Sequence, residues 1–555
     1  MDKIIEGGEF EGVSSEVALN RSLQILRNID IRAGSIGDLT LGAKDSFNDN
    51  RITNNITHNY YDRESGHEKK EKVNDTFQRY LELFRTTRPE EDQLLITNDN
   101  SPLPGTSKWI LDVVDSEALL GGTESGYHLI RGSAGKGKTF LCIYIFEHFK
   151  QRLATLAFNG VTKFIIICFH CNGQNDDRKT SVPVLRSIIY QMLQQDQTFA
   201  KHCSTYLGLN GSSDIPLERL QILFRAMISD PERKPMIWLL DGFDECDSSC
   251  KTFLSHEIER LYAPDAPKMP AVSTIVFSRD NSGLRAAKLY DLDSEKGANS
   301  NIQNDIKRLI SARISELVHI PEIQERETNE YIEIMLLDRS EGTFLWIGYA
   351  IKELRRSRTW VEFKTALELL PQGLNAIYDQ IFSRFSDRDG RLIADILALV
   401  IFSFDRFRAD CLGPALEALQ EVKDDHNDRI TPPTGITWDQ LTAHGFALLC
   451  QESLLKKKGD LVTIVHQSLA EYFMPFQKNY TTSRPSFLNI RPSVCLLRTT
   501  LACLRILSQS PLSMFDKHSS FPLLTLEDYF AVYAFCFWIP HTRWLGESTP
   551  SNSYI

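Results

Sequence analysis

The sequence has no excess of basic residues, since 62 lysines and arginines stand against 73 aspartates and glutamates, for a net charge of −11. Such a chain does not favour a general nucleic-acid-binding or anionic-membrane surface. The longest apolar segments, residues 392–404 and 529–539, fall short of a membrane-spanning length. The first residues, MDKIIEGGEFEGVSS, lack the basic start and apolar core of a secretory signal. We therefore expect a cytoplasmic protein that binds no nucleic acid and has no stable membrane insertion.

The eleven cysteines form neither a disulfide framework nor a zinc-finger pattern. They are scattered through predicted strands and helices, which is typical of buried thiols in a reducing compartment. Cys168 and Cys171 have metal-ligand spacing with His170 between them, but no partner pair lies at zinc-finger distance. A buried strand explains this segment more simply than a metal site.

A glycine-rich loop stands between a short apolar run, residues 127–130, and a helical pattern that begins at Phe140. In such a loop glycines, here Gly132 and Gly137, let the chain turn tightly, so that main-chain N–H groups reach phosphate oxygens. The lysine reaches the β- and γ-phosphates, and the following hydroxyl binds Mg²⁺. The residues expected to line the phosphates of bound ATP or ADP are Gly132, Ser133, Ala134, Gly135, Lys136, Gly137, Lys138 and Thr139.

An acidic cluster follows the apolar run 236–240 (MIWLL), which is typical of a central parallel strand. The cluster consists of Asp241, Asp244 and Glu245. Ligands of open α/β sheets bind at the carboxyl ends of strands. Asp241 is therefore expected to hold Mg²⁺ together with Thr139, and Asp244 or Glu245 to position the attacking water. A plain acidic turn is the alternative interpretation, and the glycine-rich loop upstream argues against it. The pattern predicts an α/β P-loop NTPase with a parallel sheet and flanking helices.

These motifs resemble the NACHT branch of the signal-transducing ATPases with numerous domains (STAND), which are relatives of the NOD-like immune receptors. More narrowly, they resemble the fungal NACHT group with a nephrocystin-3-like N-terminal domain. Before the phosphate loop, Thr106, Trp109 and Ile110 match a Thr-x-x-Trp-Ile pattern of that group. In such ATPases this segment often borders the adenine, although a core tryptophan is an equally good interpretation. Ala134 stands where relatives carry proline.

A strand expected at residues 271–279 (AVSTIVFSR) ends in Arg279, which matches the sensor position of the family, beside the strand of the acidic cluster. The resemblance implies that Arg279 contacts the terminal phosphate and distinguishes ATP from ADP. Relatives usually have proline after this arginine, whereas Asp280 stands here. An ion pair between Arg279 and Asp280 is the alternative interpretation.

Three later segments continue the resemblance. Residues 342–346 (GTFLW) and 370–374 (LPQGL) resemble signatures of a helical lid domain, and residues 461–473 (LVTIVHQSLAEYF) resemble the His-x-Ser segment of a winged-helix domain. In related receptors a histidine of that domain contacts the β-phosphate of bound ADP, and the resemblance implies this role for His466. A histidine held by structural hydrogen bonds is the alternative.

We expect six segments, with short helices at residues 17–31 and 76–84. Residues 39–61 are rich in asparagine and threonine, and a linker is a better interpretation of them than an amyloid-type signalling motif. No repeat period is visible near the end of the sequence, so we expect either a shortened chain or sensing by a partner protein. The segments are a variable, partly disordered stretch 1–75, a helical adenine-side segment 76–125, the NACHT domain 126–295, the helical lid 296–388, the winged helix 389–480 and a helical stub 481–555.

The resemblance implies a signalling switch that binds ATP or ADP with Mg²⁺. ADP would join the lid and winged helix to the core, and ATP would favour an open state that forms homo-oligomers. Gly242 follows Asp241, at the position where many faster ATPases have glutamate. The downstream carboxylates must therefore position the attacking water, and we expect ATP turnover to be slow. An unknown effector or sensor protein is the expected partner. A role in fungal non-self recognition or programmed cell death follows from the resemblance alone.

Three other functions stay open. A motor ATPase of the AAA+ type, such as a nucleic-acid loader, is disfavoured by the acidic charge, and nucleic-acid-stimulated turnover would support it. A non-hydrolysing scaffold would hold ADP under all conditions. A small-molecule kinase would need a substrate-binding lid that the sequence does not show.

Overall fold

The computed structural model of the chain describes residues 67–85, 103–121, 126–158, 164–173, 176–207, 215–263, 269–279, 284–285, 288–294, 298–315, 320–403, 407–423, 429–473, 485–488, 492–509 and 533–534. The chain forms two compact units, one of residues Ile56–Gln380 and one of Ile381–Ile555 together with Met1–Asn55. The helix expected at residues 17–31, the stretch 39–61 and Asp280 lie outside the described residues.

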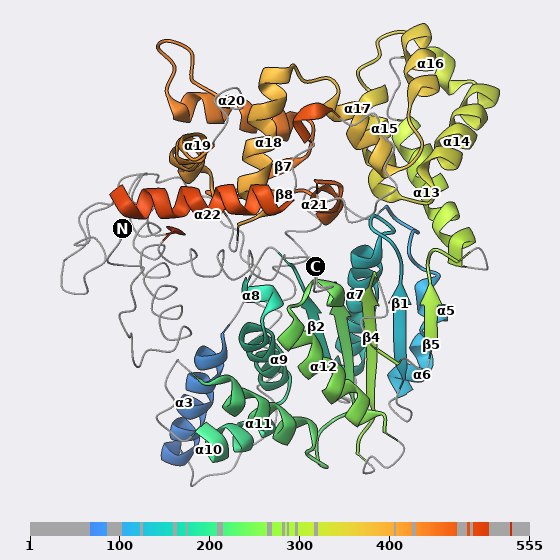
Figure 1. The fold of residues 1–555 in the computed structure, drawn as a ribbon. Helices are drawn as coiled ribbons and strands as arrows, with labels where there is room; N and C mark the ends of the chain where they lie inside the picture. Colours follow the sequence, from blue (N-terminus) through green and yellow to red (C-terminus); the bar gives the residue numbers. More distant parts are fainter. Residues whose placement is uncertain are drawn as a thin grey trace. The chain divides into compact units, whose positions relative to one another are not determined.

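A parallel sheet of five strands forms the centre of the unit Ile56–Gln380 (Figure 1). Its strand order is β2-β3-β4-β1-β5, and every neighbouring pair is parallel. The predicted α/β class is confirmed, and each apolar run that predicted a strand forms one. The strand β5 was not predicted, because it is short and partly exposed. The strands are β1 (Tyr127–Arg131), β2 (Ile165–His170), β3 (Met236–Asp241), β4 (Val272–Ser278) and β5 (Lys288–Asp291).

The register of the sheet brings the ends of four strands to one edge. Asp241, the last residue of β3, pairs with His170, the last residue of β2. Arg131, which ends β1, pairs with Ser278, which ends β4. The glycine-rich loop after β1, the acidic cluster after β3 and Arg279 after β4 therefore meet at the carboxyl edge, where ligands of open α/β sheets bind.

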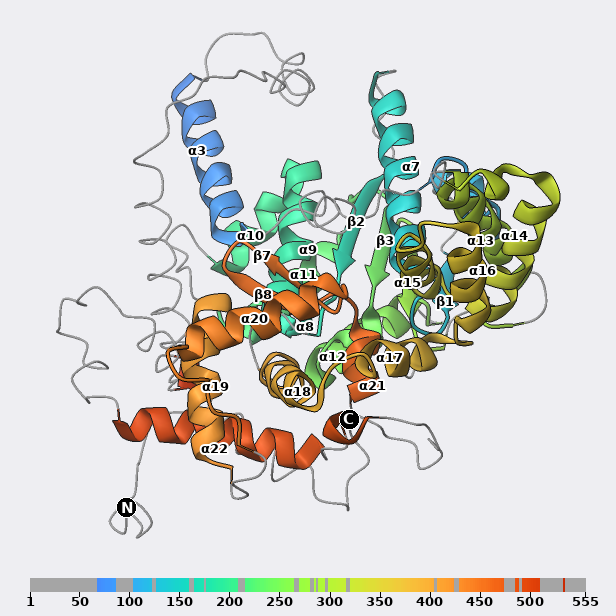
Figure 2. The same cartoon turned by 90° about the horizontal axis from the view of Figure 1, so that it is seen from above.

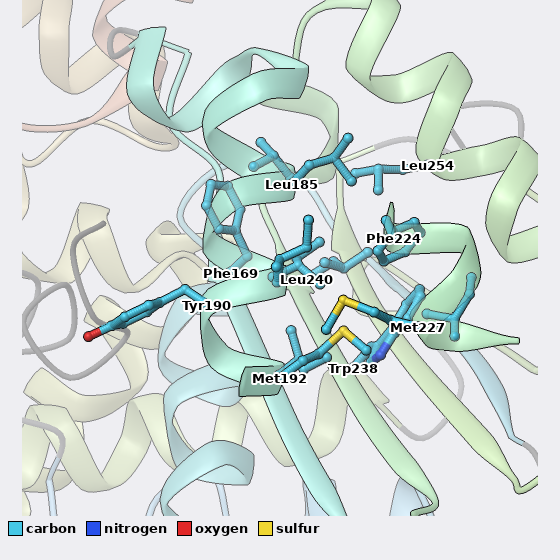
Figure 3. Close-up of a cluster of buried hydrophobic side chains, with 14 of the residues drawn as sticks. Phe169, Leu185, Tyr190, Met192, Phe224, Met227, Trp238, Leu240 and Leu254 are labelled. Atoms are coloured by element: carbon cyan, nitrogen blue, oxygen red, sulfur yellow. The ribbon is translucent and has the colours of Figure 1, made fainter. Parts of the chain in front are cut away.

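Helices cover both faces of this sheet (Figures 1 and 2). The helix α7 packs on one face, and α9, α11 and α12 form the main hydrophobic core with the other. Figure 3 shows this core around Trp238 of β3, with Phe224 of α11 and Leu254 of α12. Full burial of each such side chain contributes about 1.5–3 kcal/mol. The bounds are α7 (Lys138–Phe158), α9 (Ser181–Gln195), α11 (Leu217–Ile228) and α12 (Ser248–Leu261).

Among the described strands β2 lies at the edge of the sheet, and α9 supplies hydrogen bonds to its outer side. The side-chain amide of Gln191 accepts from the N–H of Cys168 and donates to its carbonyl, both at 2.9 Å. Gln195 does the same with the N–H and carbonyl of Ile166, at 2.9 and 2.6 Å. Buried main-chain groups need such partners, so the two glutamines hold β2 firmly against α9.

Shorter helices complete this part of the unit. The helix predicted at residues 76–84 is the end of a longer helix that begins at His67, where the sequence is charged and shows no apolar period. A 3-10 turn after β3, η2 (Phe243–Glu245), carries most of the acidic cluster. The shorter helices are α3 (His67–Phe84), α5 (Ile110–Val113), α6 (Ser116–Gly121), α8 (Asp176–Lys179) and α10 (Ala200–Leu207).

The rest of the unit is helical, as predicted. Trp346 is fully buried and donates from Nε1 to the carbonyl of Pro371 at 3.1 Å, which joins the two signatures GTFLW and LPQGL. Tyr378 is also fully buried and packs edge-on against Tyr349. The helices are α13 (Ala298–Ser315), α14 (Arg326–Ser340), α15 (Phe344–Leu354), α16 (Trp360–Leu369) and α17 (Leu374–Phe382).

In its described residues, the unit containing Ile381–Ile555 has the five α-helices α18 to α22 and a three-stranded antiparallel sheet of order β6-β8-β7. In its interior, Lys423 donates to Asp395 at 2.6 Å, and Gln420 donates to the same oxygen at 2.8 Å. In the part of the chain that the structure describes, we find no helix both long and apolar enough to cross a membrane. The elements are α18 (Asp387–Ile401), β6 (Phe407–Arg408), α19 (Leu412–Glu421), α20 (Trp438–Gln451), β7 (Leu455–Lys458), β8 (Leu461–Ile464), α21 (Gln467–Phe473) and α22 (Pro492–Gln509).

Candidate functional site

The glycine-rich loop runs from the end of β1 to the first turn of α7, as predicted. Gly135 and Gly137 have positive φ angles of +78° and +81°, which residues with a side chain rarely adopt. At Gly132 the need is different, because a Cβ there would lie 2.9 Å from the Cβ of Leu292. The turn is therefore made by Gly135 and Gly137, whereas the sequence suggested Gly132 and Gly137. The helix α7 begins at Lys138, so its positive end lies at the loop.

Lys138 is placed between the loop and the acidic cluster. Its Nζ donates to the carbonyl oxygens of Gly132 at 2.5 Å and Ser133 at 2.9 Å. Burial lowers the pKa of Lys138, and the carboxylates of Asp244 and Asp241 oppose that shift. The ammonium is therefore within electrostatic reach of both parts of the site. A lysine that binds phosphates beside a Mg²⁺ ion needs this position.

Arg279, just after β4, is bonded twice to Asp244. Its main-chain N–H donates to Oδ1 at 3.0 Å, and its Nε donates to Oδ2 at 2.5 Å. Asp244 also accepts from the hydroxyl of Ser278 at 3.3 Å. Burial would raise the pKa of Asp244, but the Arg279 guanidinium beside it holds that pKa below its usual value. Arg279 thus forms an ion pair with Asp244, while Asp280, the partner considered from the sequence, lies outside the described residues.

Glu245 has a different chemical character from Asp244. Its Oε2 accepts from the N–H of Gly173 at 3.1 Å, and its Oε1 lies 3.7 Å from Nη2 of Arg279. Burial raises the pKa of Glu245 to about 7, although Arg279 opposes the shift. A carboxyl group with a pKa near neutrality can take up or release a proton at physiological pH. Of the two predicted water-positioning carboxylates, Glu245 is therefore better suited to accept a proton.

Asp241 has a partner that the sequence did not predict. Its Oδ2 lies 3.1 Å from Nδ1 of His170, and both side chains are buried. The two residues are adjacent because they end neighbouring parallel strands in register. The sequence contained only the weak signal that His170 closes an apolar run. Without the strand order, that signal does not identify Asp241 as the partner of His170.

Asp293, in the turn after β5, holds the amino end of the loop. Its carboxylate accepts from the main-chain N–H and the hydroxyl of Ser133, at 2.6 and 2.8 Å. Its Oδ1 lies 3.4 Å from Nζ of Lys136. Lys136 is buried, and its Nζ also donates to the carbonyl of Glu341 at 2.7 Å. Lys136 therefore connects the loop to the end of α14.

The turn between α14 and α15 contacts the loop directly. The N–H of Phe344 donates to the carbonyl of Gly135 at 2.9 Å. A Cβ on Gly135 would lie 2.5 Å from Cγ2 of Thr343, and a Cβ on Gly137 would lie 3.2 Å from the ring of Phe344. The segment GTFLW, at residues 342–346, therefore packs against the phosphate loop. Nothing in the local sequence pattern indicated this contact.

The other predicted site residues lie in structural contacts. Trp109 donates from Nε1 to Oδ2 of Asp305 in α13 at 2.9 Å, and Ile110 is fully buried. His466 belongs to the unit with Ile381–Ile555, and its Nδ1 accepts from the N–H of Ser468 at 3.1 Å. The contact of His466 matches its structural alternative, whereas Trp109 is only partly buried and is not the core tryptophan considered as its alternative. The adenine-side and β-phosphate roles stay predictions.

The residues at the carboxyl edge fit a nucleoside triphosphate with Mg²⁺. The tight turn at Gly135 and Gly137, the positive end of α7 and the ammonium of Lys138 suit phosphate oxygens. The hydroxyl of Thr139 and the carboxylate of Asp241 are oxygen ligands of the kind that Mg²⁺ takes. Each group comes from an element that ends or begins at this edge.

A five-stranded parallel sheet with this loop after β1 and an acidic end of β3 defines a P-loop NTPase. Residues 105–279 match the family described as nephrocystin 3, N-terminal. Together with the parallel sheet, this match supports a P-loop NTPase domain of the NACHT/STAND class within these residues. The match includes the phosphate loop, the acidic cluster and Arg279.

Three solved structures illustrate the similarity. A STAND protein with a tetratricopeptide repeat sensor from Pyrococcus horikoshii shares 13% identity over 72% of this chain and 46% of its own, with a TM-score of 0.29. Drosophila ORC bound to DNA shares 13% over 80% and 99%, with a TM-score of 0.32. The ORC2 protein of Aeropyrum pernix shares 13% over 67% and 95%, with a TM-score of 0.29. The chain spans less than half of the Pyrococcus protein. No curated protein matches the sequence.

Proposed function

We propose that the chain is a nucleotide-controlled signalling switch that binds ATP or ADP with Mg²⁺, hydrolyses ATP slowly and oligomerises in its ATP state. One observation carries this proposal, namely the direct bonding between the phosphate loop and the helical segment after α14. Lys136 donates to the carbonyl of Glu341, and Phe344 donates to the carbonyl of Gly135. A ligand that moves the loop must strain or release these bonds. Nucleotide state thereby biases the helical segment.

Each proposed role follows from the position of a side chain. Lys138 binds the phosphates, and Thr139 with Asp241 holds Mg²⁺, which when bound supplies positive charge that neutralises the phosphate oxygens. Glu245 orients the attacking water and accepts its proton. Arg279 senses the terminal phosphate, and its guanidinium offers several donors for that contact.

The same geometry favours slow turnover. Arg279 is engaged with Asp244 through two hydrogen bonds, so it must release or share that carboxylate before it contacts a phosphate. Because the pKa of Glu245 is raised to about 7, a large share of this carboxyl group holds a proton at neutral pH and cannot accept another. Both features hold back hydrolysis, and slow hydrolysis is what a switch requires.

The remaining parts of the proposal rest on the resemblance. The helices and three-stranded sheet between α18 and α21 follow an order that supports a winged helix at residues 389–480, with His466 as its contact to ADP. The helical segment 296–388 would act as the lid. A cytoplasmic role in fungal non-self recognition or cell death, with an unknown effector or sensor partner, is the biological setting we propose.

The decisive experiment measures bound nucleotide and oligomeric state of the purified full chain. The variants are Lys138→Ala and the double variant Asp244→Ala with Glu245→Ala. Lys364→Ala, which changes an exposed lysine of α16, is the matched control. We expect ADP in a monomeric wild type, loss of nucleotide in Lys138→Ala only, and ATP-driven assembly of the double variant.

Other outcomes would contradict the switch. A wild type that binds no nucleotide and keeps one size in ATP and ADP would point to a scaffold without a nucleotide function. Bound ADP that never exchanges would indicate a scaffold that uses ADP as a structural part. ATP turnover that rises on adding nucleic acid would favour a motor ATPase.

A further inference from the structure

We propose that Cys142, Cys168 and His170 form a binding site for a single thiophilic cation of the Zn²⁺ type. Cys142 lies in α7, about one turn beyond Thr139. Cys168 and His170 are alternate residues of β2, so both point to the face that α7 covers. The two sulfur atoms and a ring nitrogen lie within 4.8 Å of one another, and all three side chains are buried.

The three residues would fill three of the four positions around a tetrahedral ion, and the spacing of Cys168 and His170 fits such an ion. The Sγ of Cys168 is 3.5 Å from Nε2 of His170. A tetrahedral Zn²⁺ with bonds of about 2.3 Å to sulfur and 2.0–2.1 Å to nitrogen separates two such ligands by roughly 3.6 Å. The atoms can therefore ligate one ion with only small movements. Two thiolates and an imidazole favour a thiophilic ion over Mg²⁺ or Ca²⁺, which take oxygen ligands.

The ring of His170 is already oriented for this role. Its Nδ1 contacts Oδ2 of Asp241 at 3.1 Å, which leaves Nε2 directed at Cys168. Metal-binding histidines commonly donate their other N–H to a carboxylate, which fixes the ring and its tautomer. The main chain of Cys168 is held as well, because its N–H donates to the side-chain amide of Gln191 and its carbonyl accepts from that amide. The ligands thus sit on a rigid strand with a supporting carboxylate.

Cys171, the partner suggested by sequence spacing, is not part of this site. It lies on the opposite face of the sheet, within the core that α9 and α12 cover. Its Sγ is 2.8 Å from Sγ of Cys246. The odd spacing between Cys168 and Cys171 sends the two thiols to different faces. Cys142, from a distant segment, takes the place that spacing assigned to Cys171.

The site would act on the nucleotide edge through one shared carboxylate. A cation on Nε2 of His170 keeps the imidazole neutral and its Nδ1–H directed at Asp241. Asp241 is therefore held in one orientation while the cation is bound. The inference does not depend on the proposed switch, because the cation would contact Cys142, Cys168 and His170, none of which is a proposed nucleotide ligand.

The test uses the full chain, purified without added nucleotide and treated with a mild chelator to remove loosely held metal. Zinc content is measured, and X-ray absorption defines the atoms around the zinc. We expect about one zinc per chain, with two sulfur ligands near 2.3 Å and a nitrogen ligand near 2.0 Å. Because a buried ligand set binds metal as the chain folds, cells are grown with added Zn²⁺.

Variants identify the ligands. Cys142→Ala and Cys168→Ala should lose the zinc, whereas Cys250→Ala, another buried cysteine, should retain it. Asp241→Asn should keep the ligands but lower zinc affinity about 10–100-fold, measured by competition with a chelating dye. A folded wild type without zinc would overturn the proposal even if the variants fail to fold. Zinc in a different ligand environment, or zinc retained in Cys168→Ala, would overturn it too.

Discussion

The Nζ of Lys136 lies 2.7 Å from the carbonyl oxygen of Glu341, so a buried lysine of the phosphate loop is bonded to the end of a distant helix. The same Nζ is 3.4 Å from Asp293, which in turn holds the N–H of Ser133. The phosphate loop, the turn after β5 and the helical segment are therefore joined by hydrogen bonds and one ion pair. Changing one member is expected to affect the others.

Lys136→Met tests this network, because methionine fills similar space without a donor. The carbonyl of Glu341 would lose the partner described here, which costs about 1–3 kcal/mol of unfolding free energy. ADP should also dissociate faster, since the loop loses a support. Denaturant unfolding and ADP release measure the two effects. Lys364→Met is the exposed control, and equal behaviour of the two variants would refute the role of Lys136.

Arg279→Lys should not preserve the function of Arg279. Lysine keeps the charge but cannot donate from a side-chain Nε to Asp244 while offering further donors to a phosphate. We expect ATP hydrolysis to fall about tenfold or more, which corresponds to at least about 1.4 kcal/mol of transition-state stabilisation. ATP binding should change little. Single-turnover hydrolysis separates these effects, and a fully active lysine variant would exclude a sensor role that depends on guanidinium geometry.

ATP hydrolysis should increase with pH through about 7, because Glu245 must lose its proton before it can accept one from water. Its ordinary pKa is lower, and burial raises the pKa to about 7, so the carboxyl group is still protonated at pH 6. The pH dependence of the hydrolysis rate at saturating ATP measures this limb. Glu245→Gln should abolish both activity and the limb. A wild-type rate that is flat between pH 6 and 8 would assign the role to another group.

Gln191→Leu should destabilise the sheet edge. The substitution leaves the buried N–H and carbonyl of Cys168 without the side-chain partners that Gln191 provides, at a cost of about 1–3 kcal/mol for each group left unpaired. Gln194→Leu, on the exposed side of the same helix, is the matched control and should stay within about 0.5 kcal/mol of wild type. Urea unfolding compares the two variants. Equal urea midpoints for the two variants would show that these hydrogen bonds make no net contribution to the free energy of unfolding.

The fold of the nucleotide-binding domain was predictable because its strands are apolar on both faces. Trp238 and its neighbours in β3 form an uninterrupted apolar run, as buried parallel strands do. The strand β5 escaped prediction, since Leu289 is 49% exposed and its neighbours are polar or charged. The start of α3 at His67 was missed for a similar reason, because apolar spacing first appears near Phe77.

Only those site residues that belong to one continuous motif were predictable from the sequence. Lys138 and Asp241 belong to motifs whose spacing reflects one loop and one strand end. The partner of Asp241 is His170, and that pairing depends on strand order, which a single sequence does not contain. The contact of Lys136 with Glu341 joins segments far apart in the sequence. Such contacts arise when helices pack, and no periodic pattern encodes them.

The two edges of the sheet hinder the addition of another strand in different ways. At β2 the glutamines of α9 occupy the main-chain groups of Ile166 and Cys168, as an additional strand would. An incoming peptide therefore finds those positions taken, and β-augmentation there would first have to displace two side-chain amides. The opposite edge, β5, has only four residues and begins with an exposed lysine, two features that discourage strand addition. Assembly of this protein is thus expected to join helices and loops, leaving the sheet of each copy separate.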